Sequence, residues 1–198
     1  LTLGTVAFPY TIYENAKQLS PASVVEYDSV DRCVKQTNYW HPHCDDGFKS
    51  IVDAANEVDR VLHENVQSFM ENSKDHTLLM SGGEDSRLLA SVMKQYGDFR
   101  GYIILDKVNT EYQLANSSFK KIGFELTLIL RCKEFYFNIL RDALNISGNN
   151  SQYMHIHGLH PELVEKLCDQ TAVGVASGYL SDAVLKGSRI KKRKLWNI

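Results

Sequence analysis

The feature that most constrains the fold is an alternation of short apolar runs with helical patterns. Apolar runs without polar alternation occupy residues 77–80, 101–106 and 125–130, as expected for strands buried on both faces. Between them, apolar residues recur at three- and four-residue steps, which predicts helices over 86–96 and 111–122. Short connections between the two kinds of element favour a mostly parallel sheet with helices on both faces.

The same pattern continues to either side of this region. Apolar residues from Phe48 to Phe69 form one stripe, which predicts a helix within 47–72 whose stripe packs into the core against the sheet. Further helices are expected around 134–144 and 161–170, before an apolar run at 172–176. We therefore expect a three-layer α/β/α domain over 47–198 with about five strands.

Residues 1–46 differ from this domain because they have no sustained helical period. We expect them to form an extended arm or linker with short strands, such as one at 23–27.

Composition limits the partners that this chain would bind. With 43% hydrophobic and 23% charged residues, the sequence is that of a globular protein. A net charge of −2 gives no overall attraction to nucleic acid or to an anionic membrane, and we expect neither as a partner. Four scattered cysteines without paired spacing indicate thiols in a reducing compartment, so a cytoplasmic location is expected.

The strongest chemical signal is Ser-Gly-Gly-Glu-Asp-Ser at residues 81–86, between a predicted strand and a predicted helix. Gly82 and Gly83 lack Cβ atoms, so the backbone N–H groups can approach a ligand closely. The helix start favours an anion, and the hydroxyls of Ser81 and Ser86 add two donors. A phosphate would be repelled by Asp85 unless a Mg2+ ion lay between them.

An ordinary strand-to-helix turn, with Asp85 and Ser86 as helix caps, is the alternative interpretation of this loop. Five fixed positions at typical residue frequencies would match by chance about once in 10^4 chains of this length. The placement between strand and helix makes a chance match rarer still, so a phosphate-binding loop is favoured.

The motif resembles the pyrophosphate loop, Ser-Gly-Gly-x-Asp-Ser, of the ATP pyrophosphatases, which split ATP between its α and β phosphates. Members of this family include asparagine synthetase, guanylate synthetase and NAD synthetase. The resemblance implies an adenine nucleotide alpha hydrolase-like fold, with ATP and Mg2+ as cofactors.

A second segment, residues 175–187, resembles the second phosphate loop of asparagine synthetases. Ser177, Gly178, Asp182 and Gly187 fall in register with that loop. The resemblance implies that Ser177 and Gly178 help to bind the nucleotide, and that Asp182 shares the metal with Asp85 in catalysis. Two carboxylates usual in the family loop are missing here, which puts metal affinity and turnover in question.

The arm also resembles the junction that follows the glutaminase domain of asparagine synthetases, in its Thr-Ile-Tyr run at 11–13 and its Tyr-Trp at 39–40. Glu111, Ala115 and Gly123 resemble the family's spacing after the second strand. No cysteine precedes Cys33, so ammonia would come from a separate glutaminase domain or subunit. The helical region after the family's second loop is missing, and the chain looks like the core of a larger synthetase.

The resemblance implies an amidoligase: Mg-ATP adenylates a carboxylate, aspartate by default, and ammonia or an amine then forms the amide with release of AMP and pyrophosphate. Two alternatives remain open. The altered second loop is consistent with a nucleotide-binding module without turnover. The basic residues 191–194 are consistent with a pyrophosphate-loop enzyme that modifies transfer RNA.

Overall fold

The computed structural model describes residues 6, 8–41, 47–72, 74–139, 160–168 and 173–178. The chain divides into two compact units, Leu1–Ala55 with Tyr136–His157 and Asn56–Phe135 with Gly158–Ile198. The predicted boundary after residue 46 stays a prediction. Within the described ranges, no helix has both the length and the apolar character that crossing a membrane requires.

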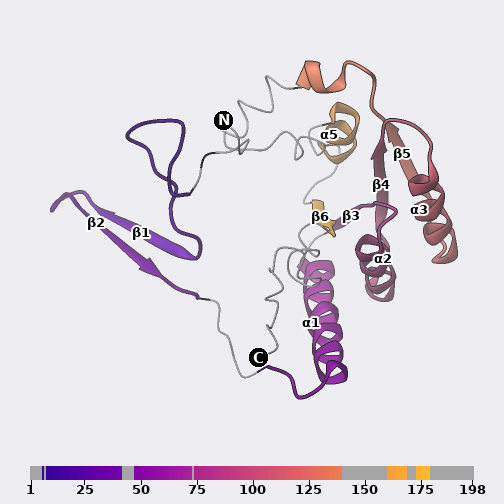
Figure 1. Cartoon of the computed structure of the whole chain (residues 1–198), viewed down its shortest axis with the longest axis horizontal. Coiled ribbons are helices and arrows are strands. Elements are labelled where there is room, and N and C mark those ends of the chain that lie inside the picture. The colour runs from indigo at the N-terminus through magenta and orange to yellow at the C-terminus, as the bar shows by residue number, and fades with distance from the viewer. Residues whose placement is uncertain are drawn as a thin grey trace, which may run out of the picture. The chain divides into compact units, whose positions relative to one another are not determined.

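An antiparallel hairpin forms the described part of the arm. Strand β1 (Ser23–Asp28) contains the predicted strand and pairs with β2 (Cys33–Asn38), from Ser23 opposite Asn38 to Asp28 opposite Cys33 (Figure 1). The Asp28 carboxylate closes the turn by accepting the N–H groups of Val30 at 2.8 Å and Asp31 at 3.1 Å. These hydrogen bonds, from Asp31 and then Val30, hold the pKa of Asp28 below its ordinary value.

Parallel strands form the sheet of the second unit. Among the described residues there are four, β3 (Asp75–Leu79), β4 (Arg100–Leu105), β5 (Leu126–Leu130) and β6 (Val173–Ser177), in the order β5-β4-β3-β6. Helices α2 (Glu84–Tyr96) and α3 (Thr110–Lys121) connect the first three (Figure 1). The predicted α/β class is confirmed.

Helices cover both faces of this sheet, as predicted. Leu78, Ile103 and Leu105 turn to one face, where they join buried residues of α1 (Ile51–Asn72), α2 and α3. On the other face, Tyr102 and Ile129 pack with Leu163 of α5 (Pro161–Cys168). Thr77 and Leu78 at the centre of β3 are both fully buried, which confirms that this strand is covered on its two faces.

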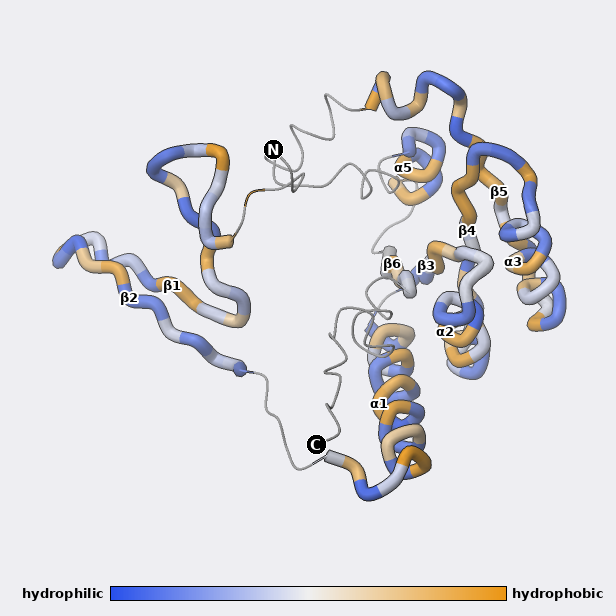
Figure 2. Tube along the Cα trace, viewed as in Figure 1, coloured by the Kyte–Doolittle hydropathy of each residue, from blue (hydrophilic) through white to orange (hydrophobic). Residues whose placement is uncertain are grey.

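The prediction for the apolar stripe of α1 was right only for the C-terminal part of the helix. Val66 and Met70 are buried in the core cluster. Ile51 is 86% exposed and Val52 62% exposed, and Phe48, before the helix, is 59% exposed. Figure 2 shows apolar residues at intervals along the whole of α1. A helical period identifies an apolar face, but it does not say how much of that face the core buries.

A close contact in the core identifies a position where β4 tolerates no side chain. A Cβ atom on Gly101 would lie 2.1 Å from Cε1 and 2.2 Å from Cζ of Phe119, whose ring is fully buried. Phe119 also makes an edge contact with Phe99, with ring centroids 5.7 Å apart. The absent side chain at Gly101 is therefore what lets α3 pack closely on the sheet.

We expect Gly101→Ala to lower the free energy of unfolding by about 1–3 kcal/mol, because the added methyl group overpacks the core. Urea unfolding followed by circular dichroism measures the loss. In the double variant with Phe119→Leu, the loss should be smaller than the sum of the two single losses. An unchanged urea midpoint for Gly101→Ala would contradict the close packing of α3 on β4.

Candidate functional site

The candidate site lies where the order of the strands reverses. The chain passes from β3 to β4 to β5 on one side, and then returns to place β6 on the other side of β3. Leu79 at the end of β3 pairs with Ser177 at the end of β6. In open parallel sheets, ligands bind at the carboxyl ends of the strands at such a reversal. The loop of residues 81–86 follows β3 at this point.

Side-chain hydroxyls close this loop on itself. The Ser86 hydroxyl is 2.9 Å from that of Ser81 and 3.0 Å from the carbonyl oxygen of Ser81. The N–H of Gly83 donates to the Ser81 hydroxyl at 3.2 Å. Ser86 is buried, with 4% of its surface exposed. Both serines therefore shape the loop, in addition to any contact that they make with a ligand.

Helix α2 begins earlier than the sequence predicts. Its first residue is Glu84, and its N-cap is Gly83, which makes no side-chain capping hydrogen bond. Asp85 and Ser86 therefore do not cap the helix, as the alternative interpretation of an ordinary turn expects, because both residues lie within the first turn. The N–H groups of a first helical turn have no acceptor within the helix, and the helix dipole adds positive potential there. These features suit an anion.

Two neighbouring segments pack against the loop from β4 and from β6. On the β4 side, a Cβ atom on Gly82 would lie 2.9 Å from the Cα of Glu111 in α3, and the Gly82 N–H donates to Glu111 Oε1 at 3.3 Å. On the β6 side, a Cβ atom on Gly178 would lie 3.1 Å from the Ser86 nitrogen and 3.3 Å from Asp85 Cβ. Glycine at both positions permits this approach.

The structure thus brings most of the predicted site residues together. The residues that meet at the strand reversal are Ser81, Gly82, Gly83, Asp85, Ser86, Ser177 and Gly178. Asp182 lies outside the described residues, as does the rest of the second loop.

Sequence reasoning missed two features at this edge of the sheet. The sequence singled out Glu111 only by its spacing from Ala115 and Gly123, and it did not indicate the contact with Gly82. Arg131 follows β5 and pairs with Asp106, which follows β4, at 2.7 Å from Nε to Oδ1. The Arg131 side chain is only 10% exposed. An arginine and an aspartate that directly follow neighbouring strands were the available signal.

The described residues supply only part of the coordination shell of a metal ion at this site. Among the described residues, no group of three or more histidine, cysteine or acidic side chains could hold a metal. Asp85 and Glu111 supply carboxylates on the two sides of the loop. Mg2+ is usually bound by one or two carboxylates together with phosphate oxygens and water, so these residues fit a metal that arrives with a nucleotide.

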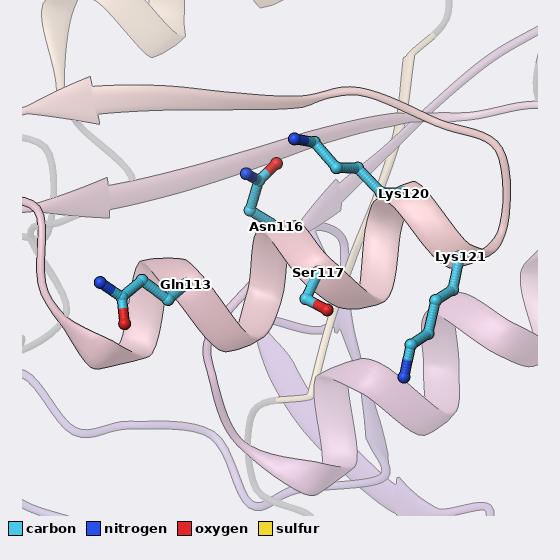
Figure 3. A pocket seen from close by; sticks show the side chains of 5 residues that line it. All are labelled: Gln113, Asn116, Ser117, Lys120 and Lys121. Atoms are coloured by element: carbon cyan, nitrogen blue, oxygen red, sulfur yellow. The ribbon is translucent and has the colours of Figure 1, made fainter.

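A separate hollow lies along α3 (Figure 3). It is lined by Gln113, Asn116, Ser117, Lys120 and Lys121. All five side chains come from this one helix, and none belongs to the loop of residues 81–86. The hollow is therefore distinct from the candidate site.

No protein-family model matches this sequence, and no curated protein matches it. Solved structures that are similar to it include the NH3-dependent NAD synthetase from Campylobacter jejuni subsp. jejuni, in complex with the nitrate ion, with a TM-score of 0.46 and 16% sequence identity. The likeness covers 67% of this chain and 59% of that chain, so the chain spans less than two thirds of the length of that protein. A likeness of this degree assigns no activity to this chain.

The approach of α3 to the loop makes Gly82 a sensitive position. We expect Gly82→Ala to lower the free energy of unfolding by about 1–3 kcal/mol, because its methyl group would meet backbone atoms of Glu111. Gly83→Ala is the matched control, since a Cβ atom there would meet only the Ser81 hydroxyl, at 3.1 Å. Its expected cost is about 0.5–1 kcal/mol, for a poorer N-cap. Equal costs in urea unfolding would argue against this packing.

Proposed function

We propose that this chain is the nucleotide-binding core of an ATP-dependent amidoligase related to asparagine synthetases. The observation that carries the proposal is the position of the Ser-Gly-Gly-Glu-Asp-Ser loop, which follows β3 at the strand reversal and lies against Gly178 at the end of β6. The two segments that resemble the family's phosphate loops are far apart in the sequence. The first loop and Gly178, in the described start of the second segment, lie against each other at one edge of the sheet, which supports a shared nucleotide site.

In the proposed reaction, a carboxylate oxygen of the substrate attacks the α-phosphorus of ATP. The bond from this phosphorus to the oxygen that bridges it to the β-phosphorus breaks, and pyrophosphate leaves. The nitrogen of ammonia or an amine then attacks the carbonyl carbon of the acyl-adenylate, the carbon–oxygen bond to AMP breaks, and the nitrogen loses a proton. The products are an amide, AMP and pyrophosphate.

The roles of the residues follow from the charge that develops in this reaction. Negative charge accumulates on the leaving pyrophosphate, and the N–H groups of residues 82–86 belong to the loop and to the first turn of α2, where the dipole favours an anion. Preorganised donors of this kind stabilise developing charge without reorganisation. Bound Mg2+ would neutralise phosphate charge, held by Asp85 and, in our proposal, Asp182. Ser177 and Gly178 would complete the nucleotide site from β6.

By family resemblance, aspartate is the default carboxylate and asparagine the default product. Ammonia would come from solution or from a glutaminase domain or subunit. The hairpin of residues 23–38 lies in the segment that resembles the junction to such a domain. The substrate and this partner rest on the resemblance alone.

ATP with Mg2+ should raise the melting temperature of the chain, because a ligand that binds the native state stabilises it by mass action. At a ligand concentration about 100 times the Kd, the stabilisation is about 2.7 kcal/mol. Asp85→Asn should remove most of the Mg2+-dependent part of the rise. Differential scanning fluorimetry with ATP, with and without Mg2+, makes the measurement.

Asp98→Asn is the matched control, since it makes the same charge change at the other end of α2, beside Lys94. It should retain the full rise in melting temperature. No rise for the unmodified chain at millimolar ATP would contradict a nucleotide site in this chain.

Turnover is a separate expectation from binding. With Mg-ATP, aspartate and ammonium, we expect AMP and pyrophosphate to form in equal amounts, together with asparagine, and Asp85→Asn to lower the rate at least about a hundredfold. Chromatography of the nucleotides and of the amino acids follows both products. Mg-ATP binding without AMP release, across a panel of carboxylates, would instead identify a nucleotide-binding module without turnover.

A further inference from the structure

A carboxylate already occupies one of the donors that a phosphate group would use. The N–H of Gly82, at the tip of the loop, donates to Oε1 of Glu111 at 3.3 Å. Glu111 is only partly buried, so solvent and solutes reach this position. An oxygen of a negatively charged group therefore accepts a hydrogen bond at the place where the proposed function puts a pyrophosphate oxygen.

The position of Glu111 is set by its backbone. Its Cα and its carbonyl oxygen would lie 2.9 and 3.0 Å from a Cβ atom on Gly82. The start of α3 is also fixed locally, because the side chain of its N-cap, Asn109, accepts the N–H of Tyr112 at 3.1 Å. Glu111 therefore stays beside the loop, and only its side chain is able to turn away.

This arrangement makes Glu111 and an incoming phosphate compete. Both are acceptors for the same N–H, and two negative charges held next to each other near a protein surface repel each other. A metal ion between the phosphate and the carboxylate turns this repulsion into attraction. Without a metal ion, the phosphate must displace the side chain and still tolerate its charge.

We propose that Glu111 is a specificity-determining residue that admits the metal-bound nucleotide and discriminates against metal-free ATP and free pyrophosphate. The inference rests on the proposed nucleotide site and adds a selectivity to it. Discrimination of this kind would also help pyrophosphate to leave once it has lost its metal ion.

The test is the affinity of Glu111→Gln for metal-free and metal-bound ligands. The substitution keeps an oxygen that accepts the Gly82 N–H but removes the charge. Isothermal titration calorimetry with ATP and with inorganic pyrophosphate, in EDTA and in millimolar Mg2+, gives the dissociation constants. We expect metal-free ATP and pyrophosphate to bind at least about tenfold more tightly to the variant, and Mg-ATP to bind no more tightly than it does to the unmodified chain.

Glu125→Gln is the matched control. It makes the same charge change at an exposed position that directly precedes β5. This position lies at the end of the sheet where the strands begin, whereas the candidate site lies where they end. The control should bind every ligand as the unmodified chain does. A general effect of net charge would shift both variants alike, and that result would overturn the assignment of selectivity to Glu111.

The remaining outcomes separate this inference from the proposed function. If the unmodified chain binds Mg-ATP and Glu111→Gln leaves the ratio of metal-free to metal-bound affinity unchanged, the selectivity is wrong and the nucleotide site stands. If Glu111→Gln weakens both forms, Glu111 is a ligand and not a discriminator. Binding of metal-free ATP by the variant and not by the unmodified chain would support the selectivity. If neither protein binds ATP with or without Mg2+, both proposals are overturned.

Discussion

The pairing of β6 with β3 is the interaction on which the rest of the candidate site depends. β3 pairs with β4 on one side and with β6 on the other, so it has a parallel partner at both of its edges. This pairing reverses the strand order and carries Gly178 to the start of α2. Without it, the loop after β3 would lie at the edge of a three-stranded sheet and would have only α3 as a neighbour.

The conformation of the loop depends on close packing at its glycines and on hydrogen bonds between its own serines. Gly82 lets the backbone of α3 approach to a distance that a Cβ atom would not allow, and Gly178 lets the end of β6 approach to a distance at which a Cβ atom would be tightly packed. The hydroxyls of Ser81 and Ser86 then fasten the turn from within. Such a loop is preorganised before any ligand arrives, which is the condition under which fixed N–H groups stabilise charge well.

The two carboxylates near the loop have different relations to it. Asp85 belongs to the first turn of α2 and is part of the loop itself. Glu111 belongs to the first turn of α3 and reaches the loop from there through a hydrogen bond of 3.3 Å to the Gly82 N–H. A hydrogen bond of this length is easily broken, so the Glu111 side chain suits an adjustable role.

Much of the architecture was predictable because local pattern and burial agree. The apolar runs at 77–80, 101–106 and 125–130 each became a strand to within two residues at either end, since strands covered on both faces leave a strong signal. The stripe of α1 misled for the residues before Leu62, because a sequence period contains no information on how far the core extends. The hairpin partner β2, whose residues are all exposed, left no apolar signal to find.

By itself, the sequence determined the strands and helices of the parallel-sheet unit, the α/β class and the loop with its two glycines. Each of these follows from chemistry within about a dozen neighbouring residues, such as the lack of a Cβ atom or the spacing of apolar side chains. Only the tertiary structure decided that β6 lies beside β3 and that Glu111 accepts the Gly82 N–H. Gly82 and Glu111 are 29 positions apart, and the paired residues of β3 and β6 are farther apart than that. Contacts over such separations form only when the whole sheet is assembled.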